Sequence, residues 1–337
     1  MEMIACISLL PLSLALMAGL WLCMRAYISL ARKRGIVNGS GNNAVVTGGG
    51  IVIPIAYAAA EFYHLLSTGS LIYPWFFIGL AVIATVSFVD DIDNLSPMLR
   101  LAVHFLCCSL LIFQIIDSVP SFQPSALLIA VLLTCTVAVV NTFNFLDGIK
   151  GITGCYALTV MIPPLFFTCH AINDLVIIAM VCAVIVFSAF NFRTPERCYC
   201  GDTGSISLGY FIAFYLLLQA VSQHSSPDSA AITCDFTVVA LTIVYLVDFS
   251  LTLLIRSIRR ENLLQSHHSH LYQRLAFEGG VSHMRIALGY AATQLAISIV
   301  YILVPTSYHL SVLVLSILAL TGAYTFISLR LNAARKL

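Results

Sequence analysis

Apolar stretches long enough to cross a lipid bilayer follow one another along almost the whole chain. A helix needs about 20 residues to cross the hydrocarbon layer, and cutting the sequence at its polar breaks leaves about eleven such segments. Only 9% of the 337 residues are charged, and the polar breaks are too short for a separate soluble domain. We therefore expect an all-α integral membrane protein in which residues 1–337 form a single polytopic transmembrane domain. The expected spans cover roughly 3–23, 48–66, 71–89, 101–117, 125–144, 152–172, 174–190, 206–222, 235–255, 286–304 and 309–328.

The positive charges are distributed unevenly between the two sides of these spans. All 16 Lys and Arg residues lie in alternate connections or after the last span. Cytoplasmic connections of membrane proteins carry an excess of Lys and Arg. The pattern predicts a cytoplasmic C-terminus and an N-terminus on the opposite, periplasmic side. Most carboxylates of the connections lie on the positive side, so we expect the functional site on the cytoplasmic face.

The first polar cluster ends the third expected span with Asp90, Asp91 and Asp93. Carboxylates this close repel one another unless a cation compensates their charge. Mg²⁺ prefers oxygen ligands and usually takes one or two carboxylates together with substrate phosphates. The cluster favours a metal site, and a solvated acidic loop is the simpler alternative.

The second cluster contains Asn141, Asn144 and Asp147, each three residues after the last. On a helix this spacing forms one polar face. Two amides and a carboxylate are costly to place against lipid, so they should line the helix bundle or a cavity. Hydrogen bonding between helices is the alternative role.

The third cluster reads G-D-T-G-S at 201–205, with Asn191 and Arg197 shortly before it. Asp202 lies between small residues that would leave its carboxylate accessible to a metal. The glycines permit close backbone approach, and the N–H groups at the start of the next helix could meet phosphate oxygens. An ordinary turn before a helix would have the same composition.

The fourth cluster, His267, His268, His270 and Arg274, lies in the longest connection. No cysteine or carboxylate stands at a convincing spacing for structural zinc. Imidazole and guanidinium groups also donate hydrogen bonds to phosphate oxygens, so anion binding is the preferred interpretation. Asp248, inside the ninth expected span, is a further functional candidate, with pairing to Arg256 as the alternative.

Carboxylates for a divalent metal and donors for phosphate oxygens together indicate phosphoryl transfer. Because the chain is embedded in a membrane, one substrate is expected to be a lipid. A transporter is the main alternative without an enzyme activity, although transporter sites lie near the membrane midplane rather than at one surface. An intramembrane prenyltransferase would also use aspartates and Mg²⁺, but it would not need the histidine loop.

The four clusters, in this order between these spans, resemble the polyprenyl-phosphate N-acetylhexosamine-1-phosphate transferase family. The matching patterns are D-D at 90–91, N-x-x-N-x-x-D-G at 141–148, Asn191 with G-D-x-G-S at 201–205, and H-x-S-H-x-Y-Q-R at 267–274. The resemblance implies a bacterial inner-membrane enzyme that uses Mg²⁺ to join a UDP-activated N-acetyl amino sugar phosphate to undecaprenyl phosphate, releasing UMP. The histidine motif resembles the O-antigen branch more than the peptidoglycan translocase branch. No nucleic-acid partner is implied, and a homodimer is left open.

The resemblance also implies roles for individual residues. Asp202 would be a Mg²⁺ ligand with Asp91 as the second, and Asp90 would handle the lipid phosphate. Nucleotide, diphosphate, phosphate or sugar contacts would come from the remaining candidates, which are Asn141, Asn144, Asp147, Lys150, Asn191, Arg197, His267, His268, His270 and Arg274.

Two features depart from the family pattern. Before the glycines at 48–50 the family often has a Pro-Thr-Pro-Arg-like stretch, but here the residues are Ala44-Val45-Val46-Thr47. Many relatives carry a second acidic residue shortly after Asp147, where this chain has Lys150. An ammonium cannot bind a metal, although it could hold a phosphate.

Overall fold

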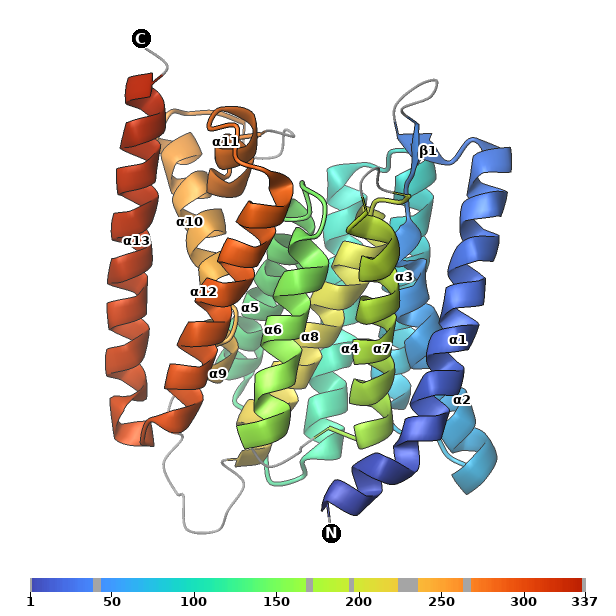
Figure 1. Ribbon diagram of the computed structural model, residues 1–337. Helices are drawn as coiled ribbons and strands as arrows, with labels where there is room; N and C mark the ends of the chain where they lie inside the picture. The colour runs from blue at the N-terminus through green and yellow to red at the C-terminus, as the bar shows by residue number, and fades with distance from the viewer. Residues whose placement is uncertain are drawn as a thin grey trace. The chain divides into compact units, whose positions relative to one another are not determined.

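The computed structural model describes residues 2–38, 44–167, 172–193, 197–223, 236–262 and 268–334, which form helices and one pair of very short strands (Figure 1). Among these described residues, nine helices are long and apolar enough to cross a membrane. The helical membrane architecture is confirmed, while the count of about eleven spans, their orientation and the single domain stay predictions. In chain order the elements are α1 (Glu2–Arg34), β1 (Val37–Asn38), β2 (Val45–Val46), η2 (Gly49–Ile51), α2 (Val52–Thr68), α3 (Pro74–Ile92), α4 (Pro97–Ser118), α5 (Ala126–Phe145), α6 (Ile152–Phe167), α7 (Asp174–Asn191), α8 (Gly201–Gln223), α9 (Thr237–Ala240), α10 (Ile243–Ile258), α11 (Leu271–Phe277), α12 (His283–Leu303), η3 (Thr306–Tyr308) and α13 (His309–Ala334).

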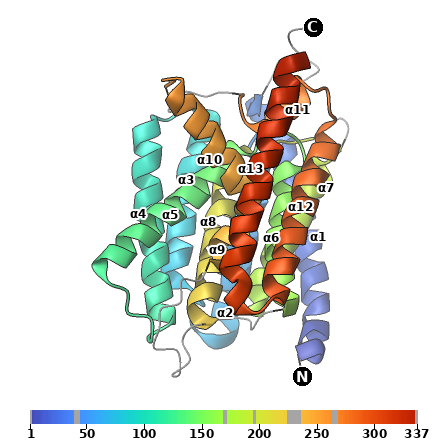
Figure 2. The ribbon, with the colours of Figure 1, turned by 90° about the vertical axis from the view of Figure 1, so that its left-hand side faces the viewer.

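The chain divides into two compact units, each built from segments that are distant in the sequence. Unit 1 comprises Met1–Asn144 and His170–Ser229, and unit 2 comprises Phe145–Cys169 and Ala230–Leu337. In unit 1, α3 packs against α4 and α8, while α7 packs against α1 and α2. In unit 2, α12 packs against α6 and also contacts α10 and α13 (Figures 1 and 2). The candidate residues are therefore described unit by unit.

Helix α1 continues well beyond the end predicted for the first span. The apolar run stops near residue 23, but the helix ends only at Arg34. The prediction was wrong here because a change in polarity was taken for the end of a helix, whereas Ala, Leu, Arg and Lys are all good helix formers. As a result, Arg25 and Arg32 stand on a rigid helix rather than in a loop.

The single helix predicted at 235–255 is instead broken into α9 and α10. The buried Gln294 accepts a hydrogen bond from Val244 N–H (3.1 Å) and donates one to Ala240 C=O (3.0 Å). The hydroxyl of Tyr156 accepts from Tyr245 N–H (3.2 Å). Side chains from α12 and α6 thus bond to backbone groups at the break, which is a recognised cause of helix interruption.

Candidate active site

Two carboxylates from distant parts of unit 1 meet around one guanidinium. Asp90 lies in the last turn of α3, and Asp202 lies in the first turn of α8. The guanidinium of Arg100 on α4 lies 2.6 Å from Asp90 Oδ2 and 3.1 Å from Asp202 Oδ2. The side chain of Asp90 is 6% exposed and that of Asp202 is 28% exposed, so only Asp202 is readily reached from solution.

Arg100 takes this position because of how α4 begins. Ser96 caps the helix by accepting a hydrogen bond from Leu99 N–H (3.2 Å), and Pro97 occupies the first turn. Arg100 therefore lies one turn into α4. Arg100 is one of the 16 cations whose distribution predicts the topology, and it was not predicted as a site residue. The crowded carboxylates at 90–93 implied a compensating cation, and Arg100 is the next cation along the chain.

Asp91 points to a different set of groups from its neighbour Asp90. Its Oδ1 accepts Asp202 N–H (2.9 Å), and its Oδ2 accepts the N–H (3.0 Å) and the hydroxyl (2.6 Å) of Thr203. These N–H groups are among the four that every helix start leaves without intrahelical partners. Asp91 thus caps α8 from another helix and holds Asp202 in place. Thr203 was not singled out from the sequence.

The turn into α8 depends on glycine at 201. Gly201 has φ +72°, a left-handed conformation that L side chains rarely adopt. An added Cβ would lie 2.5 Å from Asp91 Oδ2 and 2.6 Å from Gly48 N. The glycine therefore permits the close approach of the Asp91 carboxylate to the helix start.

The glycine loop at 48–50 packs directly against the segment before α8. Strands β1 and β2 pair antiparallel, and Tyr199 N–H donates to Val46 C=O (2.8 Å). Gly49 and Gly50 N–H groups donate to the carbonyls of Tyr199 and Cys200, at 2.9 Å each. The Val-Val stretch that departs from the family pattern forms β2, as suits β-branched residues. Whether the Ala44-Val45-Val46-Thr47 sequence changes the activity stays a question for experiment.

Gly50→Ala is expected to lower the thermal midpoint of the purified protein by several degrees, because a Cβ at this position would clash with the backbone of Gly204. The matched control is Gly19→Ala, since a Cβ at Gly19 meets no atom within 4 Å. The measurement is thermal unfolding in detergent. An unchanged midpoint for Gly50→Ala would show that the two segments are not packed as described.

The amide cluster is only partly arranged as predicted. Asn144 Nδ2 donates to Ser205 Oγ (3.3 Å), and the Asn144 side chain also interacts with Asp202. Asn141 donates to Val137 C=O (2.8 Å) and interacts with the buried His104. The predicted common face with Asp147 is wrong, because α5 ends at Phe145 and Asp147 follows in the connection before α6.

Two further unit 1 candidates have contacts of another kind. Asn191, at the end of α7, donates to Cys198 C=O (2.9 Å), so its amide holds the loop that leads to α8. Arg197 is exposed and lines a hollow together with Arg25 and Arg32 of α1. The predicted substrate contacts of Asn191 and Arg197 stay predictions.

In unit 2, Asp248 on α10 is a buried carboxylate that organises the histidine loop. Its Oδ1 accepts Leu271 N–H (3.0 Å) and the Thr252 hydroxyl (3.2 Å), and lies 3.4 Å from His270 Nδ1. Its Oδ2 accepts the Tyr290 hydroxyl (2.6 Å) and Tyr272 N–H (3.4 Å). Asp248 therefore ties the start of α11 to α10 and α12.

Arg256, the alternative partner proposed for Asp248, has other contacts in the described part of the chain. It pairs with Glu261 (3.0 Å) and donates to Asn262 C=O (2.6 Å). Pairing with Arg256 is therefore not the role of Asp248 in the described residues, and its functional role stays a prediction.

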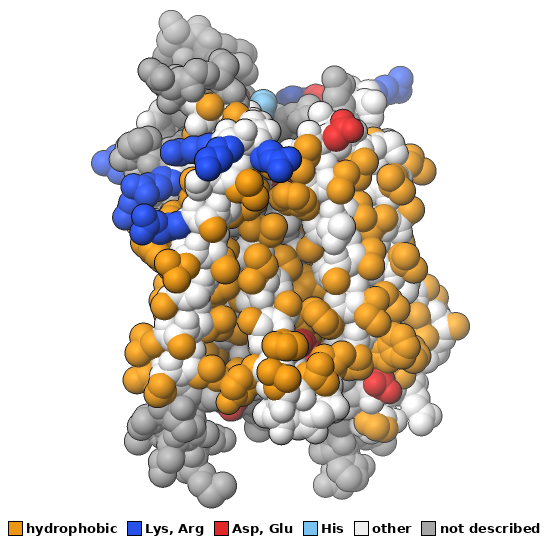
Figure 3. Space-filling view, turned by 90° about the vertical axis from the view of Figure 1, so that its right-hand side faces the viewer, with side chains coloured by type: hydrophobic (Ala, Val, Ile, Leu, Met, Phe, Trp, Pro, Cys, Tyr) orange, Lys and Arg blue, Asp and Glu red, His pale blue; other side chains and the backbone are white. Residues whose placement is uncertain are grey.

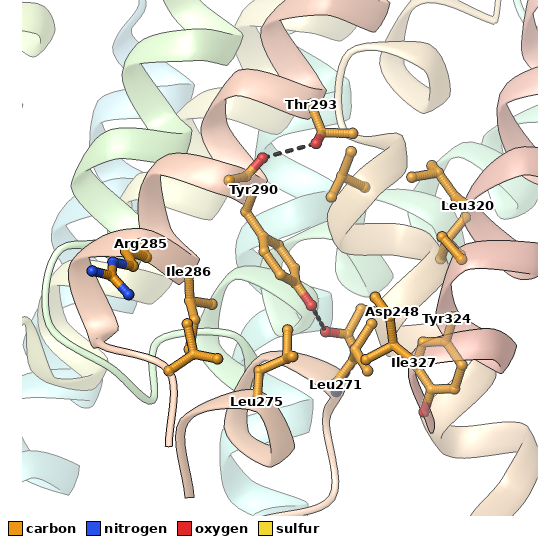
Figure 4. Close-up of a pocket in the computed structure, with 15 residues that line it drawn as sticks. Asp248, Leu271, Leu275, Arg285, Ile286, Tyr290, Thr293, Leu320, Tyr324 and Ile327 are labelled. Carbon is orange, nitrogen blue, oxygen red and sulfur yellow. Dashed lines mark hydrogen bonds between the residues drawn. The ribbon is translucent and has the colours of Figure 1, made fainter. Parts of the chain in front are cut away.

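A cavity of about 310 Å³ lies beside this group, between α10, α11, α12 and α13. Figure 4 shows the Tyr290–Asp248 hydrogen bond at its edge, with Leu271 and Leu275 of α11 nearby. Leu320 and Ile327 of α13 line another part of the wall. Leu271 is nevertheless buried, so the hydrogen bonds to Asp248 add to the packing that positions α11.

The remaining candidates of unit 2 lie on or near α11 and in the turn after α5. The exposed His268 is 3.4 Å from Gln273, and Arg274 contacts Glu278 (3.1 Å) and Asn332 (2.8 Å). Asp147 accepts a hydrogen bond from Thr153, and Lys150 is half-buried in the same turn. His267 lies outside the described residues.

Tyr272 joins the histidine loop to the end of α5. Burial raises the pKa of its hydroxyl well above the usual range, so the group stays protonated near neutral pH. It donates to Phe145 C=O (3.1 Å) in the last turn of α5. This bond satisfies one of the carbonyls that a helix end leaves without a partner.

The oxygen atoms around Asp202 fit Mg²⁺. The described residues contain no group of three or more His, Cys, Asp or Glu side chains arranged to hold a metal. Mg²⁺ does not need such a group, because it is commonly held by one or two carboxylates together with substrate phosphates. Asp90 and Asp202 supply that pair, with the Asn144 amide beside Asp202. Asp91 accepts hydrogen bonds at the start of α8, and Asp90 accepts one from Leu95 N–H (2.6 Å) as well as from Arg100. The prediction of Asp91 as the second ligand stays a prediction, with Asp90, which lies beside Asp202, as the alternative.

A known protein family matches the part of the chain that contains Asp90, Arg100 and Asp202. The family described as glycosyl transferase family 4 matches residues 73–220. A phospho-N-acetylmuramoyl-pentapeptide-transferase of Fervidobacterium nodosum is 36% identical over 78 residues, which cover 23% of this chain and 25% of the relative. A decaprenyl-phosphate N-acetylglucosaminephosphotransferase of Mycobacterium tuberculosis is 24% identical over 236 residues, or 62% of this chain and 57% of the relative.

A protein of the same name from Mycolicibacterium smegmatis is 25% identical over 276 residues, covering 77% of this chain and 62% of the relative. The chain thus spans less than two thirds of the length of each of these relatives. The family match contains the aspartates, Arg100 and the amide cluster, but not the histidine loop or Asp248. The resemblance inferred from the ordered motifs is confirmed by the family match over residues 73–220 and by relatives named as a phospho-N-acetylmuramoyl-pentapeptide-transferase and a decaprenyl-phosphate N-acetylglucosaminephosphotransferase.

Proposed function

We propose that this protein is a Mg²⁺-dependent enzyme of the bacterial inner membrane that transfers an N-acetylhexosamine 1-phosphate from a UDP-sugar to undecaprenyl phosphate. The products would be UMP and the lipid-linked diphosphate sugar that initiates O-antigen or a related envelope polysaccharide. The observation that carries the proposal is the pair Asp90 and Asp202, held at the ends of two apolar helices with Arg100 between them. The names of the relatives support a polyprenyl phosphate or amino sugar substrate.

In the proposed reaction, an oxygen of the lipid phosphate attacks the sugar-linked phosphorus of the donor. The bond from that phosphorus to the bridging oxygen breaks, and UMP leaves with the electron pair. A phosphate monoester with a second pKa of about 6 is mostly dianionic at pH 7, so no side chain has to remove a proton. The protein therefore acts mainly by positioning and by offsetting charge.

Different residues of unit 1 would position the substrates and offset their charge. Asp202 and Asp90 would hold Mg²⁺, which when bound would offset negative charge on the donor diphosphate. Arg100 neutralises the carboxylate pair and could donate to a phosphate oxygen. Asp91 fixes the first turn of α8, so it sets the direction of Asp202 without touching the substrate. Asn144 orients Asp202 from α5.

The residues of unit 2 are assigned by resemblance and by their chemistry. Asp147, Lys150, His268, His270 and Arg274 would contact phosphate or sugar groups of the substrates. For His270, Asp248 Oδ1 lies 3.4 Å from His270 Nδ1 and can orient the ring.

The test is an assay of membranes with undecaprenyl phosphate, Mg²⁺ and a panel of UDP-N-acetyl sugars. We expect UMP and a sugar-linked lipid diphosphate with one preferred donor, and loss of both when EDTA removes the metal. Membranes that contain an active family member serve as the positive control. No UMP with any donor, alongside a working control, would contradict the proposal.

The donor panel also separates the alternatives. The relative from Fervidobacterium nodosum favours a second candidate, a transferase of the peptidoglycan type, which would use UDP-N-acetylmuramoyl-pentapeptide. Product with that donor alone would establish the second candidate. A prenyltransferase would release pyrophosphate instead of UMP, and a transporter would form neither product.

A further inference from the structure

Three arginines from two segments of unit 1 surround a hollow at one end of α1. The hollow has a volume of about 350 Å³. Arg25, Ser29 and Arg32 line it from one face of α1, and Arg197 lines it from the loop before α8. Ile28 and Phe190 form the apolar part of the wall. The lining thus combines three positive charges with an apolar surface and contains no carboxylate among the described residues.

Neither ion pairing nor the helix dipole explains this cluster. In the described ranges no Asp or Glu forms an ion pair with any of the three guanidinium groups. Cations in the last turn of a helix are stabilised by the helix dipole, which accounts for Arg32, Lys33 and Arg34. It does not account for Arg25, about two turns earlier, or for Arg197, which lies outside α1.

The hollow lies at the depth where a membrane surface is expected. Trp21 packs on Phe190 with ring centroids 4.5 Å apart and is 37% exposed, as is typical of an aromatic residue at a membrane interface. Arg25 lies one turn further along α1, a rise of about 6 Å. Figure 3 shows Lys and Arg side chains gathered at this end, next to a surface of hydrophobic side chains.

We propose that this hollow binds the phosphodiester group of an anionic phospholipid from the surrounding bilayer. Guanidinium groups donate paired hydrogen bonds to phosphate oxygens, and converging arginines match a phosphate that is already at the membrane surface. Basic pockets between helices on the cytoplasmic side are a known form of lipid headgroup site. The glycerol and the first acyl carbons would lie against Phe190 and Ile28. The site is separate from the carboxylate cluster and does not rest on the proposed transferase activity.

The test measures lipid binding rather than turnover. The full-length protein, purified in a neutral detergent, is titrated with phosphatidylglycerol and with phosphatidylcholine of identical acyl chains, and bound lipid is counted by native mass spectrometry. The test variant is R25Q/R32Q. The matched control is K33Q/R34Q, which removes the same charge from the same end of α1 but changes no residue of the hollow.

We expect the wild-type protein to prefer phosphatidylglycerol, and R25Q/R32Q to weaken that binding by about tenfold or more, to the level of phosphatidylcholine. K33Q/R34Q should keep the preference. Both variants carry exposed substitutions, and elution as a single species on size exclusion checks their folding. If R25Q/R32Q does not fold, the single change R25Q is compared with R34Q in the same way.

Three outcomes would overturn the proposal. An equal loss of binding in both variants would show only general attraction to a positive surface. Displacement of the lipid by low millimolar inorganic phosphate would make the hollow a site for free phosphate. Binding of undecaprenyl phosphate with the same dependence on Arg25 and Arg32, in place of phosphatidylglycerol, would assign the hollow to the acceptor.

Discussion

Asp202→Asn is expected to reduce formation of the lipid-linked sugar by about 10²–10³-fold while the protein level in the membrane is kept. The amide has nearly the same shape and can still accept a hydrogen bond from Arg100. It lacks the negative charge that, together with Asp90, would hold Mg²⁺ against the donor diphosphate. The loss should therefore appear mainly in kcat, with a higher Mg²⁺ concentration needed for half-maximal rate. The measurement is UMP release at several Mg²⁺ concentrations.

The control for this substitution is Asp117→Asn in the last turns of α4. It makes the same chemical change at an exposed carboxylate away from the cluster, and activity should be unchanged. Normal turnover by Asp202→Asn would remove Asp202 from the site.

Asp90→Asn and Asp91→Asn separate the two neighbouring aspartates. If Asp90 is the second Mg²⁺ ligand, Asp90→Asn should need a higher Mg²⁺ concentration for half-maximal rate, as Asp202→Asn does. Asp91→Asn should instead lower thermal stability, because an amide NH₂ would face the N–H donors of α8. An altered Mg²⁺ dependence in Asp91→Asn but not in Asp90→Asn would identify Asp91 as the second ligand.

Asp248→Asn is expected to lower both the thermal midpoint and the transferase activity, the latter by about 10- to 100-fold. Whichever carboxylate oxygen is replaced by NH₂, one backbone N–H of α11 loses its acceptor, from either Leu271 or Tyr272. A hydroxyl can rotate to accept a hydrogen bond instead, but a backbone N–H cannot. These hydrogen bonds tie the start of α11 to α10, so the orientation of His270 should be disturbed together with the position of the helix.

Two comparisons separate positioning from a general loss of stability. If Asp248 acts through His270, Asp248→Asn should cost much less activity in a His270→Gln background than alone. Thr293→Val changes the wall of the same cavity but removes only a bond to Gly289 C=O, and should leave kcat near the wild-type value. Wild-type activity and stability in Asp248→Asn would refute the positioning role.

The membrane architecture could be predicted because hydropathy is a local property. Each apolar stretch of about 20 residues has to form a helix in lipid, whatever its neighbours are. The family resemblance could also be inferred from the sequence, because the order of the polar clusters along the chain is specific. Helix ends were less certain, since α1 continues through its arginines and α9 and α10 are separated by contacts from Gln294 and Tyr156.

The sequence by itself determined that the candidate residues follow apolar helices and carry the groups needed to bind a metal and phosphate. Only the tertiary structure decided which groups meet. Asp90 and Asp91 are neighbours in the chain, yet one faces Arg100 and Asp202 while the other caps α8. Arg197, counted among the substrate-binding candidates, lines a hollow together with two arginines of α1. Such pairings depend on the packing of helices about a hundred residues apart, and no local pattern of polarity records that packing.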